Sequence, residues 1–136
     1  MKDTKKKFLD FKVDVKAAVP VYEQIKRTLK FAVLSGRLQD GDKLMSLREL
    51  SMKLQINPNT IIKVYTQLES EGYIYSRPGA GYFVKLDKEK VKKGKHELLE
   101  KETLEYISKV TELGFSIDDI TAVIGKYLKG EYNDKD

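Results

Sequence analysis

Short polar side chains gather at the start of a predicted helix near the middle of this 136-residue chain. Asn57, Asn59 and Thr60 carry amide and hydroxyl groups, and Lys63 adds a positive charge one turn later on the same outward side. Side chains of these types near a helix N-terminus can hydrogen-bond to base edges in a major groove. The free backbone N–H groups at that end also attract a phosphate. The alternative is that Asn57 only caps the helix and that the others are merely exposed.

A second candidate contact lies at the start of the preceding helix. Residues 46–49 have the sequence of a capping box, in which the Ser46 hydroxyl and the Glu49 carboxylate accept hydrogen bonds from backbone N–H groups. Ser46 could also donate to a phosphate, although capping is its simpler role. Arg48 is expected to face outward, where its fork of donors suits a base edge or a phosphate. The alternative is a surface arginine that pairs with a nearby acid.

Apolar side chains at helical spacing predict the elements that position these groups. Helices are expected at residues 20–35, 46–55 and 57–71, with prolines at the starts of the first and third and a glycine after each of these two. Two short helices joined by a tight turn, the second of which has its own N-cap residue, are typical of a helix-turn-helix. Residues 11–15 have the composition of a short β-strand.

A β-hairpin is predicted directly after this pair of helices. Strands rich in aromatic and β-branched residues at 73–76 and 82–85 flank a Gly/Pro-rich tip at 77–81. A hairpin in this place is a wing. Arg77 and Gly79 would skirt the minor groove, because a glycine lets the backbone come close. The alternative is that the tip glycines only permit the turn.

The remainder of the chain is expected to have another role. Residues 88–95 read as a charged linker or a weak first helical turn, followed by one helix that ends at Gly114 and another that opens with a capping box at 116–119. The last helix carries an apolar stripe formed by Ile120, Val123, Ile124, Tyr127 and Leu128.

Two helices on a linker cannot bury the apolar sides of both helices against each other alone, so the stripe of the last helix is expected to pack on a partner surface. Self-association would give a dimer with two DNA-binding domains, which matches a palindromic site whose half-sites lie about one turn of the DNA helix apart. The alternative is that the helices fold back onto the chain's own winged domain.

Composition agrees with a DNA-binding part followed by a part of different character. Residues 1–85 contain sixteen Lys and Arg against nine Asp and Glu, whereas residues 86–136 contain ten against twelve. The absence of cysteine excludes disulfides and thiolate metal sites. The charged N-terminus, with no apolar core after it, gives no sign of export, so a cytoplasmic location is expected.

No arrangement of catalytic residues is present. The single histidine, His96, stands in a Lys/Glu-rich segment without Ser, Cys or Asp partners in a known order. Asp118 and Asp119 are better explained as acids at a helix start. We therefore predict no enzyme activity, no cofactor and no metal site.

Five motifs in order together resemble the GntR family of bacterial transcription regulators, over about residues 11–85. They lie at residues 20–25, 41–50, 57–60, 68–73 and 79–84. The resemblance implies dimeric binding to operator DNA, with contacts at the matched positions Arg48, Asn59, Thr60, Lys63 and Gly79. Met45 departs from the family, which usually has proline before the serine at position 46, so the turn that enters the helix at 46–55 is expected to be less rigid. The short C-terminal part resembles that of the YtrA subfamily.

Together these observations predict an α+β, mainly helical fold: a winged helix-turn-helix at residues 11–85 and a C-terminal helical dimerisation segment at 86–136. The predicted function is a homodimeric repressor bound to a palindromic operator in double-stranded DNA. The predicted DNA contacts are Ser46, Arg48, Asn57, Asn59, Thr60, Lys63, Arg77 and Gly79. A winged-helix module that binds protein or structured RNA is the alternative. Whether a small-molecule effector exists is left open.

Overall fold

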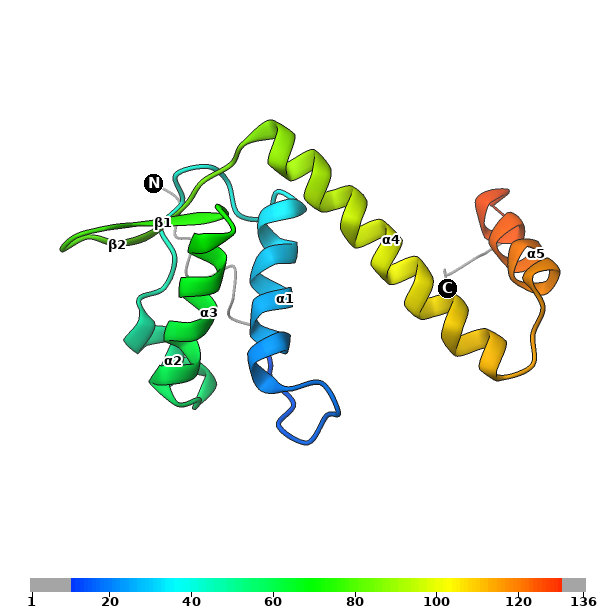
Figure 1. Cartoon of the computed structure of the whole chain (residues 1–136), viewed down its shortest axis with the longest axis horizontal. Helices are drawn as coiled ribbons and strands as arrows, with labels where there is room; N and C mark the ends of the chain where they lie inside the picture. Colours follow the sequence, from blue (N-terminus) through cyan, green and yellow to red (C-terminus); the bar gives the residue numbers. More distant parts are fainter. Residues whose placement is uncertain (1–10, 131–136) are drawn as a thin grey trace. The chain divides into compact units, whose positions relative to one another are not determined.

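The computed structural model describes residues 11–130 (Figure 1). The elements follow in the order α1 (Val21–Leu34), α2 (Leu47–Leu54), α3 (Pro58–Ser70), β1 (Ile74–Arg77), β2 (Gly81–Val84), α4 (Lys88–Glu112) and α5 (Ile117–Leu128). The chain divides into two compact units between Lys92 and Lys93. The predicted fold class, α+β and mainly helical with a winged helix-turn-helix, is confirmed.

The first unit has a continuous apolar core. α3 packs against α1, α2 and β1, so it lies at the centre of this unit (Figure 1). Apolar residues recur at three- and four-residue spacing along each helix, which places them on one face. The most deeply buried large side chains are Ile25, Leu29, Val33, Leu38, Leu44, Leu50, Ile61, Val64, Tyr65, Leu68, Ile74 and Val84.

The turn between α2 and α3 is held by local hydrogen bonds. Gln55 adopts a left-handed conformation with φ of 56° and ends α2. The Ser51 hydroxyl donates to the Ile56 carbonyl at 2.6 Å, and the Ile56 N–H donates to the Ser51 carbonyl at 3.0 Å. Ser51 is therefore a buried polar residue with its hydrogen bond satisfied. Both hydrogen bonds of this turn are thus made within residues 51–56.

The hairpin forms with antiparallel register, from Ile74 opposite Val84 to Arg77 opposite Gly81. The loop before α2 joins its edge through a bridge between Lys43 and Phe83. In that bridge region the Leu44 N–H donates to the Tyr82 carbonyl at 2.9 Å. The wing is therefore tied to the entry of α2 as well as to α3.

The strand expected at residues 11–15 is not present. The segment turns back on itself, and its backbone pairs with a side chain of α1: the Asp14 N–H donates to Gln24 Oε1 at 2.9 Å, and Gln24 Nε2 donates to the Asp14 carbonyl at 2.7 Å. A strand needs a neighbouring strand to pair with. The glutamine amide satisfies this backbone instead.

Of the two interpretations of residues 88–95, the charged linker is wrong and the first helical turn is nearer, because α4 runs without interruption from Lys88 to Glu112. The Asp87 carboxylate accepts hydrogen bonds from the backbone N–H groups of Glu89 (2.9 Å) and Lys90 (3.2 Å), so the helix has a defined start. Gly94 costs about 1 kcal/mol relative to alanine inside a helix. The lysines and glutamates around it are good helix formers and sustain the helix across it.

The capping box predicted for the last helix is confirmed. The Ser116 N–H donates to Asp119 Oδ2 at 2.8 Å, and the Asp119 N–H donates to Ser116 Oγ at 3.1 Å. The hydrogen bonds from Ser116 hold the pKa of Asp119 below its ordinary value.

Within α4 and α5, only Gly94 and Ile120 are buried. No helix between residues 11 and 130 has the length and apolar character needed to cross a membrane.

Candidate nucleic-acid interface

The outward side of α3 carries a line of polar residues. Ile61, Val64, Tyr65 and Leu68 form its buried face. On the opposite side, Asn59 and Lys63 follow each other at a spacing of four residues and are exposed, as are Thr66 and Ser70 further along. Thr60 lies at the edge of this face and is half-buried. The predicted residues Asn59, Thr60 and Lys63 therefore belong to one accessible surface.

Asn57 caps α3 as predicted. Its side-chain oxygen accepts a hydrogen bond from the Asn59 N–H at 2.8 Å, and Pro58 occupies the first helical turn. The cap uses only the oxygen of the Asn57 amide, so the NH₂ group is left as a donor on an exposed residue. Capping and a contact to DNA are therefore compatible at this position.

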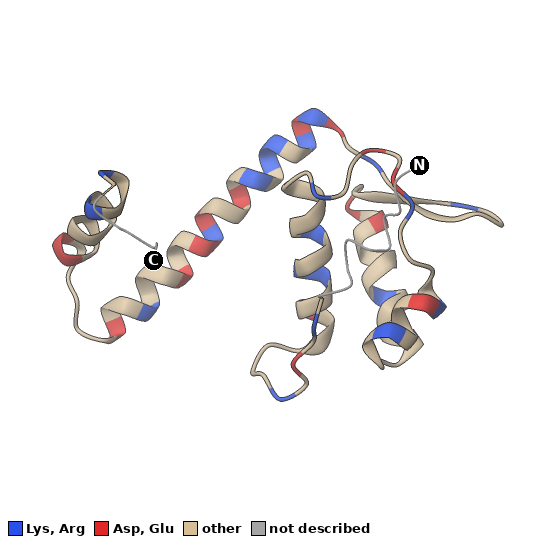
Figure 2. Ribbon diagram, turned by 180° about the vertical axis from the view of Figure 1, so that it is seen from behind, with Lys and Arg blue, Asp and Glu red and all other residues tan. Residues whose placement is uncertain are grey.

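The start of α2 presents Arg48. The capping box is confirmed: Glu49 N–H donates to Ser46 Oγ at 3.0 Å, and Ser46 N–H donates to Glu49 Oε1 at 2.9 Å. Arg48 is exposed on the side of α2 away from the buried residues Leu50 and Ser51. Figure 2 shows basic residues on α2, on α3 and on the wing. The phosphate contact of Ser46 stays a prediction.

The two glycines of the wing tip have different surroundings. Both have positive φ, 76° at Gly79 and 112° at Gly81. A Cβ at Gly81 would lie 3.3 Å from Lys43 Cε, whereas nothing lies within 4 Å of a Cβ at Gly79. The positive φ favours glycine at both positions, and at Gly81 the Lys43 side chain would also have to shift slightly to admit a Cβ. Gly79 leaves an open backbone at the tip, where a ligand can approach closely.

Arg77, at the end of β1, is exposed but ordered by the wing. Its guanidinium lies over the Phe83 ring, 5.3 Å from the centroid, and this ring stacks on Tyr75 at 5.7 Å. A guanidinium on an aromatic face keeps its donors at the edge for a further partner. The aromatic pair on the strands therefore positions the predicted minor-groove side chain.

A buried tyrosine connects the parts of this surface. The Tyr65 hydroxyl of α3 donates to the Met45 carbonyl at 2.7 Å, and its ring meets that of Tyr82 edge-on at 4.9 Å. Burial raises the pKa of Tyr65 well above its ordinary value, so the phenol stays protonated as the donor. Met45 is itself buried. Hence the turn entering α2 is anchored although it lacks the proline that the family usually has there.

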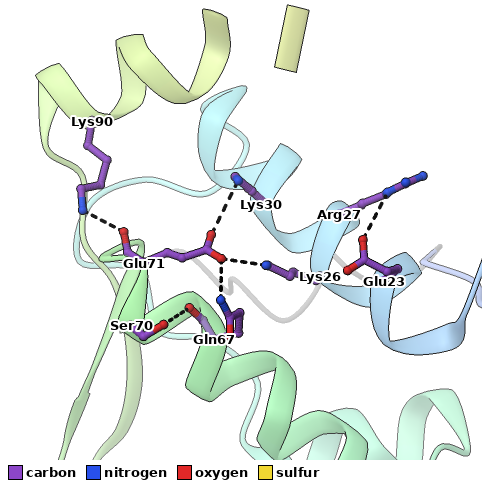
Figure 3. A network of polar contacts seen from close by, with 8 residues as sticks. All are labelled: Glu23, Lys26, Arg27, Lys30, Gln67, Ser70, Glu71 and Lys90. Atoms are coloured by element: carbon purple, nitrogen blue, oxygen red, sulfur yellow. Dashed lines mark hydrogen bonds and ion pairs between the residues drawn. The ribbon is translucent and has the colours of Figure 1, made fainter. Parts of the chain in front are cut away.

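The far end of α3 is anchored by Glu71 (Figure 3). Its carboxylate accepts from Lys26 Nζ at 2.7 Å and from Gln67 Nε2 at 2.9 Å, and Lys30 Nζ lies 3.6 Å away. Its backbone carbonyl accepts from Lys90 Nζ at 2.8 Å. Although partial burial raises the pKa of Glu71, the hydrogen bonds from Lys26 and Gln67 outweigh this and hold it below its ordinary value. One residue thus links α1, α3 and the first turn of α4.

Sequence reasoning did not single out Ile62 and Thr66, which belong to the exposed surface of α3. Ile62 is 42% exposed and lies between Asn59 and Thr66 on successive turns. The helical spacing of the sequence could have predicted their exposure, because both positions fall outside the apolar stripe of this helix. The Lys26–Glu71 pair was also missed, since 45 positions separate its partners in the sequence.

The predicted pairing residues of α5 fall into two groups. Val123, Ile124, Tyr127 and Leu128 are 48%, 45%, 50% and 83% exposed, but Ile120 is only 6% exposed and is already covered.

His96 is exposed as expected, and it has an acidic neighbour that the sequence analysis did not predict: its Nε2 lies 3.2 Å from Glu100 Oε2. Among residues 11–130, no group of His, Asp and Glu is arranged to hold a metal ion.

A helix-turn-helix with a wing, and with polar side chains along the outward side of its second helix, defines a DNA-binding transcription regulator. Residues 21–84 match the family described as bacterial regulatory proteins, gntR family. The chain belongs to this family, and its resemblance to the YtrA subfamily is confirmed.

Individual relatives agree with this assignment. The HTH-type transcriptional repressor YtrA of Bacillus subtilis (strain 168) is 42% identical over 72 residues, which cover 53% of this chain and 55% of YtrA. The uncharacterized HTH-type transcriptional regulator YhcF of the same organism is 32% identical over 112 residues, covering 82% of this chain and 92% of YhcF. The chain thus spans about half the length of the first relative and most of the second.

A solved GntR family transcriptional regulator from Listeria monocytogenes superposes with a TM-score of 0.71 at 32% identity, over 82% of this chain and 97% of that one. The family and these relatives are transcription regulators, which confirms the prediction that the chain is not an enzyme.

Proposed function

We propose that this chain is a homodimeric repressor that binds a palindromic operator in duplex DNA, with residues 11–85 as the DNA-binding domain and residues 86–136 as the dimerisation segment. The α3 N-terminus enters the major groove, the start of α2 contacts the groove edge and the wing tip approaches the minor groove. The proposed contacts are Ser46, Arg48, Asn57, Asn59, Thr60, Lys63, Arg77 and Gly79.

The exposed polar line on α3 is the observation that carries this proposal. Asn59 and Lys63 face away from the core, next to a capped helix start whose backbone N–H groups attract phosphate. Between Asn59 and Ser70, Ile62 is the one apolar side chain at an exposed position of α3, whereas a surface that docks on an apolar protein partner would carry several. The excess of Lys and Arg in residues 1–85 adds attraction to the phosphate backbone.

Two exposed apolar surfaces support pairing of two copies. On α5, the exposed residues Val123, Ile124, Tyr127 and Leu128 share one face. Leu99 and Tyr106 lie seven residues apart on α4 and are 61% and 44% exposed, and Leu113, in the turn directly after this helix, is 73% exposed. Helices of two chains that pack together carry apolar side chains at two positions of every seven, and this spacing matches one of these positions. Burying these side chains in a second copy removes apolar surface from water.

Repression, rather than activation, follows the name of the relative YtrA, which is a transcriptional repressor. A protein bound over a promoter blocks transcription without a further contact, so the two described units are sufficient for this role. Binding to the chromosome also places the protein in the cytoplasm of a bacterial cell.

A mobility-shift experiment on the full chain tests the proposal. We expect the wild-type protein to bind a duplex from its own promoter with a Kd on the order of 10⁻⁸ M or tighter, with a steep salt dependence, and to leave a matched RNA unshifted. Arg48→Ala should weaken binding about 10–100-fold and flatten the preference among duplexes, because it removes a bidentate donor.

The matched control is Arg27→Ala, since Arg27 lies on α1 beside Glu23 and outside the proposed surface. It should leave the preference among duplexes unchanged. Equal competition by unrelated DNA for the wild-type protein would contradict specific readout, and a preference for the RNA would support the alternative module.

A further inference from the structure

Ile62 is an apolar side chain in a polar setting. It is 42% exposed, whereas Ile61 beside it is completely buried. The exposed positions that follow it on α3 are Lys63, Thr66 and Ser70, all polar. Ile62 comes three residues after Asn59 and four before Thr66, so it lies on the same side of the helix as both. Its side chain is thus presented within the surface proposed to read DNA.

Only one apolar group is offered to such a side chain in the major groove. Base edges present hydrogen-bond donors and acceptors, together with the C5 methyl group of thymine. Ile62 is the fifth residue of α3, in the N-terminal half of the helix, where a recognition helix approaches base edges. The amide of Asn59 and the ammonium of Lys63 gain nothing from a methyl group. An aliphatic side chain does, because contact removes both apolar surfaces from water.

The shape of isoleucine suits this contact. A β-branched side chain has one strongly preferred χ1 rotamer in a helix, so its methyl groups are held in place before binding. More than half of the Ile62 surface is covered by the protein, which restrains it further. Little conformational freedom is therefore lost when a second methyl group packs against it.

We propose that Ile62 is a specificity-determining residue that selects thymine at one position of each operator half-site by packing against its C5 methyl group. This inference rests on the proposed function, in which α3 lies in the major groove. It assigns to Ile62 a discrimination between thymine and the same base without its methyl group, which the amide of Asn59 and the ammonium of Lys63 cannot supply.

The test uses the full chain and the operator that the wild-type protein selects from random duplexes. Each thymine is replaced in turn by deoxyuridine, which removes the methyl group and keeps the base pair. We expect one position per half-site at which the replacement weakens wild-type binding about fourfold, the effect of one buried methyl group. Replacement in both half-sites should weaken binding about 15-fold, because separated positions add.

Variants of Ile62 complete the comparison. Ile62→Ala should bind the thymine operator several-fold more weakly and lose the difference between thymine and deoxyuridine at that position. Ile62→Val, which keeps the branched carbon, should retain part of the difference. Asn59→Ala is the matched control: it should weaken binding to both operators and keep their ratio. Thermal melts of each variant establish that it is folded.

Two failures are distinguishable. If the wild-type protein enriches no sequence, the proposed function fails and this inference fails with it. If it enriches an operator but is indifferent to every thymine methyl group, or if Ile62→Ala keeps the full deoxyuridine effect, this inference alone is overturned.

Discussion

The two units of this chain differ in how they treat apolar side chains. In the winged unit, α1, α3 and the hairpin bury whole side chains such as Ile25, Ile61 and Val84. In α4 and α5, Ile120 is the one aliphatic side chain that is buried, and Leu99, Leu104 and Leu128 are more than half exposed. The first unit therefore has a packed core of its own, whereas the second leaves apolar surface exposed, as the proposed pairing of two copies requires.

This contrast agrees with the proposed division of the chain into a part that recognises DNA and a part that pairs with a second copy. A rigid reading surface needs side chains fixed by a packed core and by hydrogen bonds such as that between Tyr65 and Met45. A pairing surface needs apolar area that stays open until the second copy arrives. Mutations of the same residue type in the two units should therefore give different phenotypes.

The largest expected contrast compares two isoleucines on amphipathic helices. Ile61→Ala should lower the free energy of unfolding of the winged unit by about 2–5 kcal/mol, because Ile61 is completely buried. Ile124→Ala should leave that unit's stability unchanged, since Ile124 is 45% exposed, and should instead weaken self-association. Thermal melts and sedimentation at several protein concentrations measure the two effects. Equal losses of stability of the winged unit in Ile61→Ala and Ile124→Ala would contradict the difference in packing between the two units.

An intermediate effect is expected from two tyrosines. Tyr65→Phe removes the donor to the Met45 carbonyl and leaves a buried acceptor unsatisfied, at a cost of about 1–3 kcal/mol. Tyr106→Phe, on the exposed face of α4, should have no measurable effect on unfolding of the winged unit. Urea denaturation of both variants checks this prediction. An unchanged midpoint for Tyr65→Phe would show that this hydrogen bond does not anchor the turn before α2.

The smallest expected effect concerns pH. The pKa of Glu71 is lowered in the folded chain, so its contribution is present above its ordinary value of 4.5 and is lost as the pH falls through the lowered value. For Lys26, burial lowers the pKa but the Glu71 carboxylate outweighs this and raises it. Its contribution is present below 10.5 and is lost as the pH rises through the raised value.

Glu71→Gln should therefore flatten the pH dependence of the melting temperature below about pH 4.5. The matched control, Glu102→Gln on the exposed surface of α4, should leave that dependence as it is. Identical pH profiles for wild type and Glu71→Gln would show that the Glu71 network does not contribute to stability.

Local signals in the sequence were read most reliably. The capping boxes at Ser46 and Ser116 and the Asn57 cap depend on side chains that reach only two or three residues, so spacing alone predicts them. The helix-turn-helix and the wing followed from these signals. Gly94 misled the reading of α4, because a single glycine does not outweigh a run of good helix formers.

Contacts between distant residues were beyond the sequence. The Tyr65–Met45 hydrogen bond and the Glu71 network join residues that only the tertiary fold brings together. The α5 stripe was predicted as one surface, yet Ile120 is covered while its neighbours on the same face are exposed. A helical period identifies which face is apolar, but the other elements decide how much of that face is already occupied.

Selection of bound duplexes from a random pool by the full chain tests the central claim most directly. A homodimer that reads a palindromic operator should enrich two inverted half-sites with centres about 10 base pairs, one helical turn, or a multiple of that distance apart. Ile124→Ala should select the same half-site sequence with a relaxed requirement for the second copy. Enrichment of no sequence, or of a single half-site without a symmetric partner, would contradict a homodimer that reads a palindromic operator.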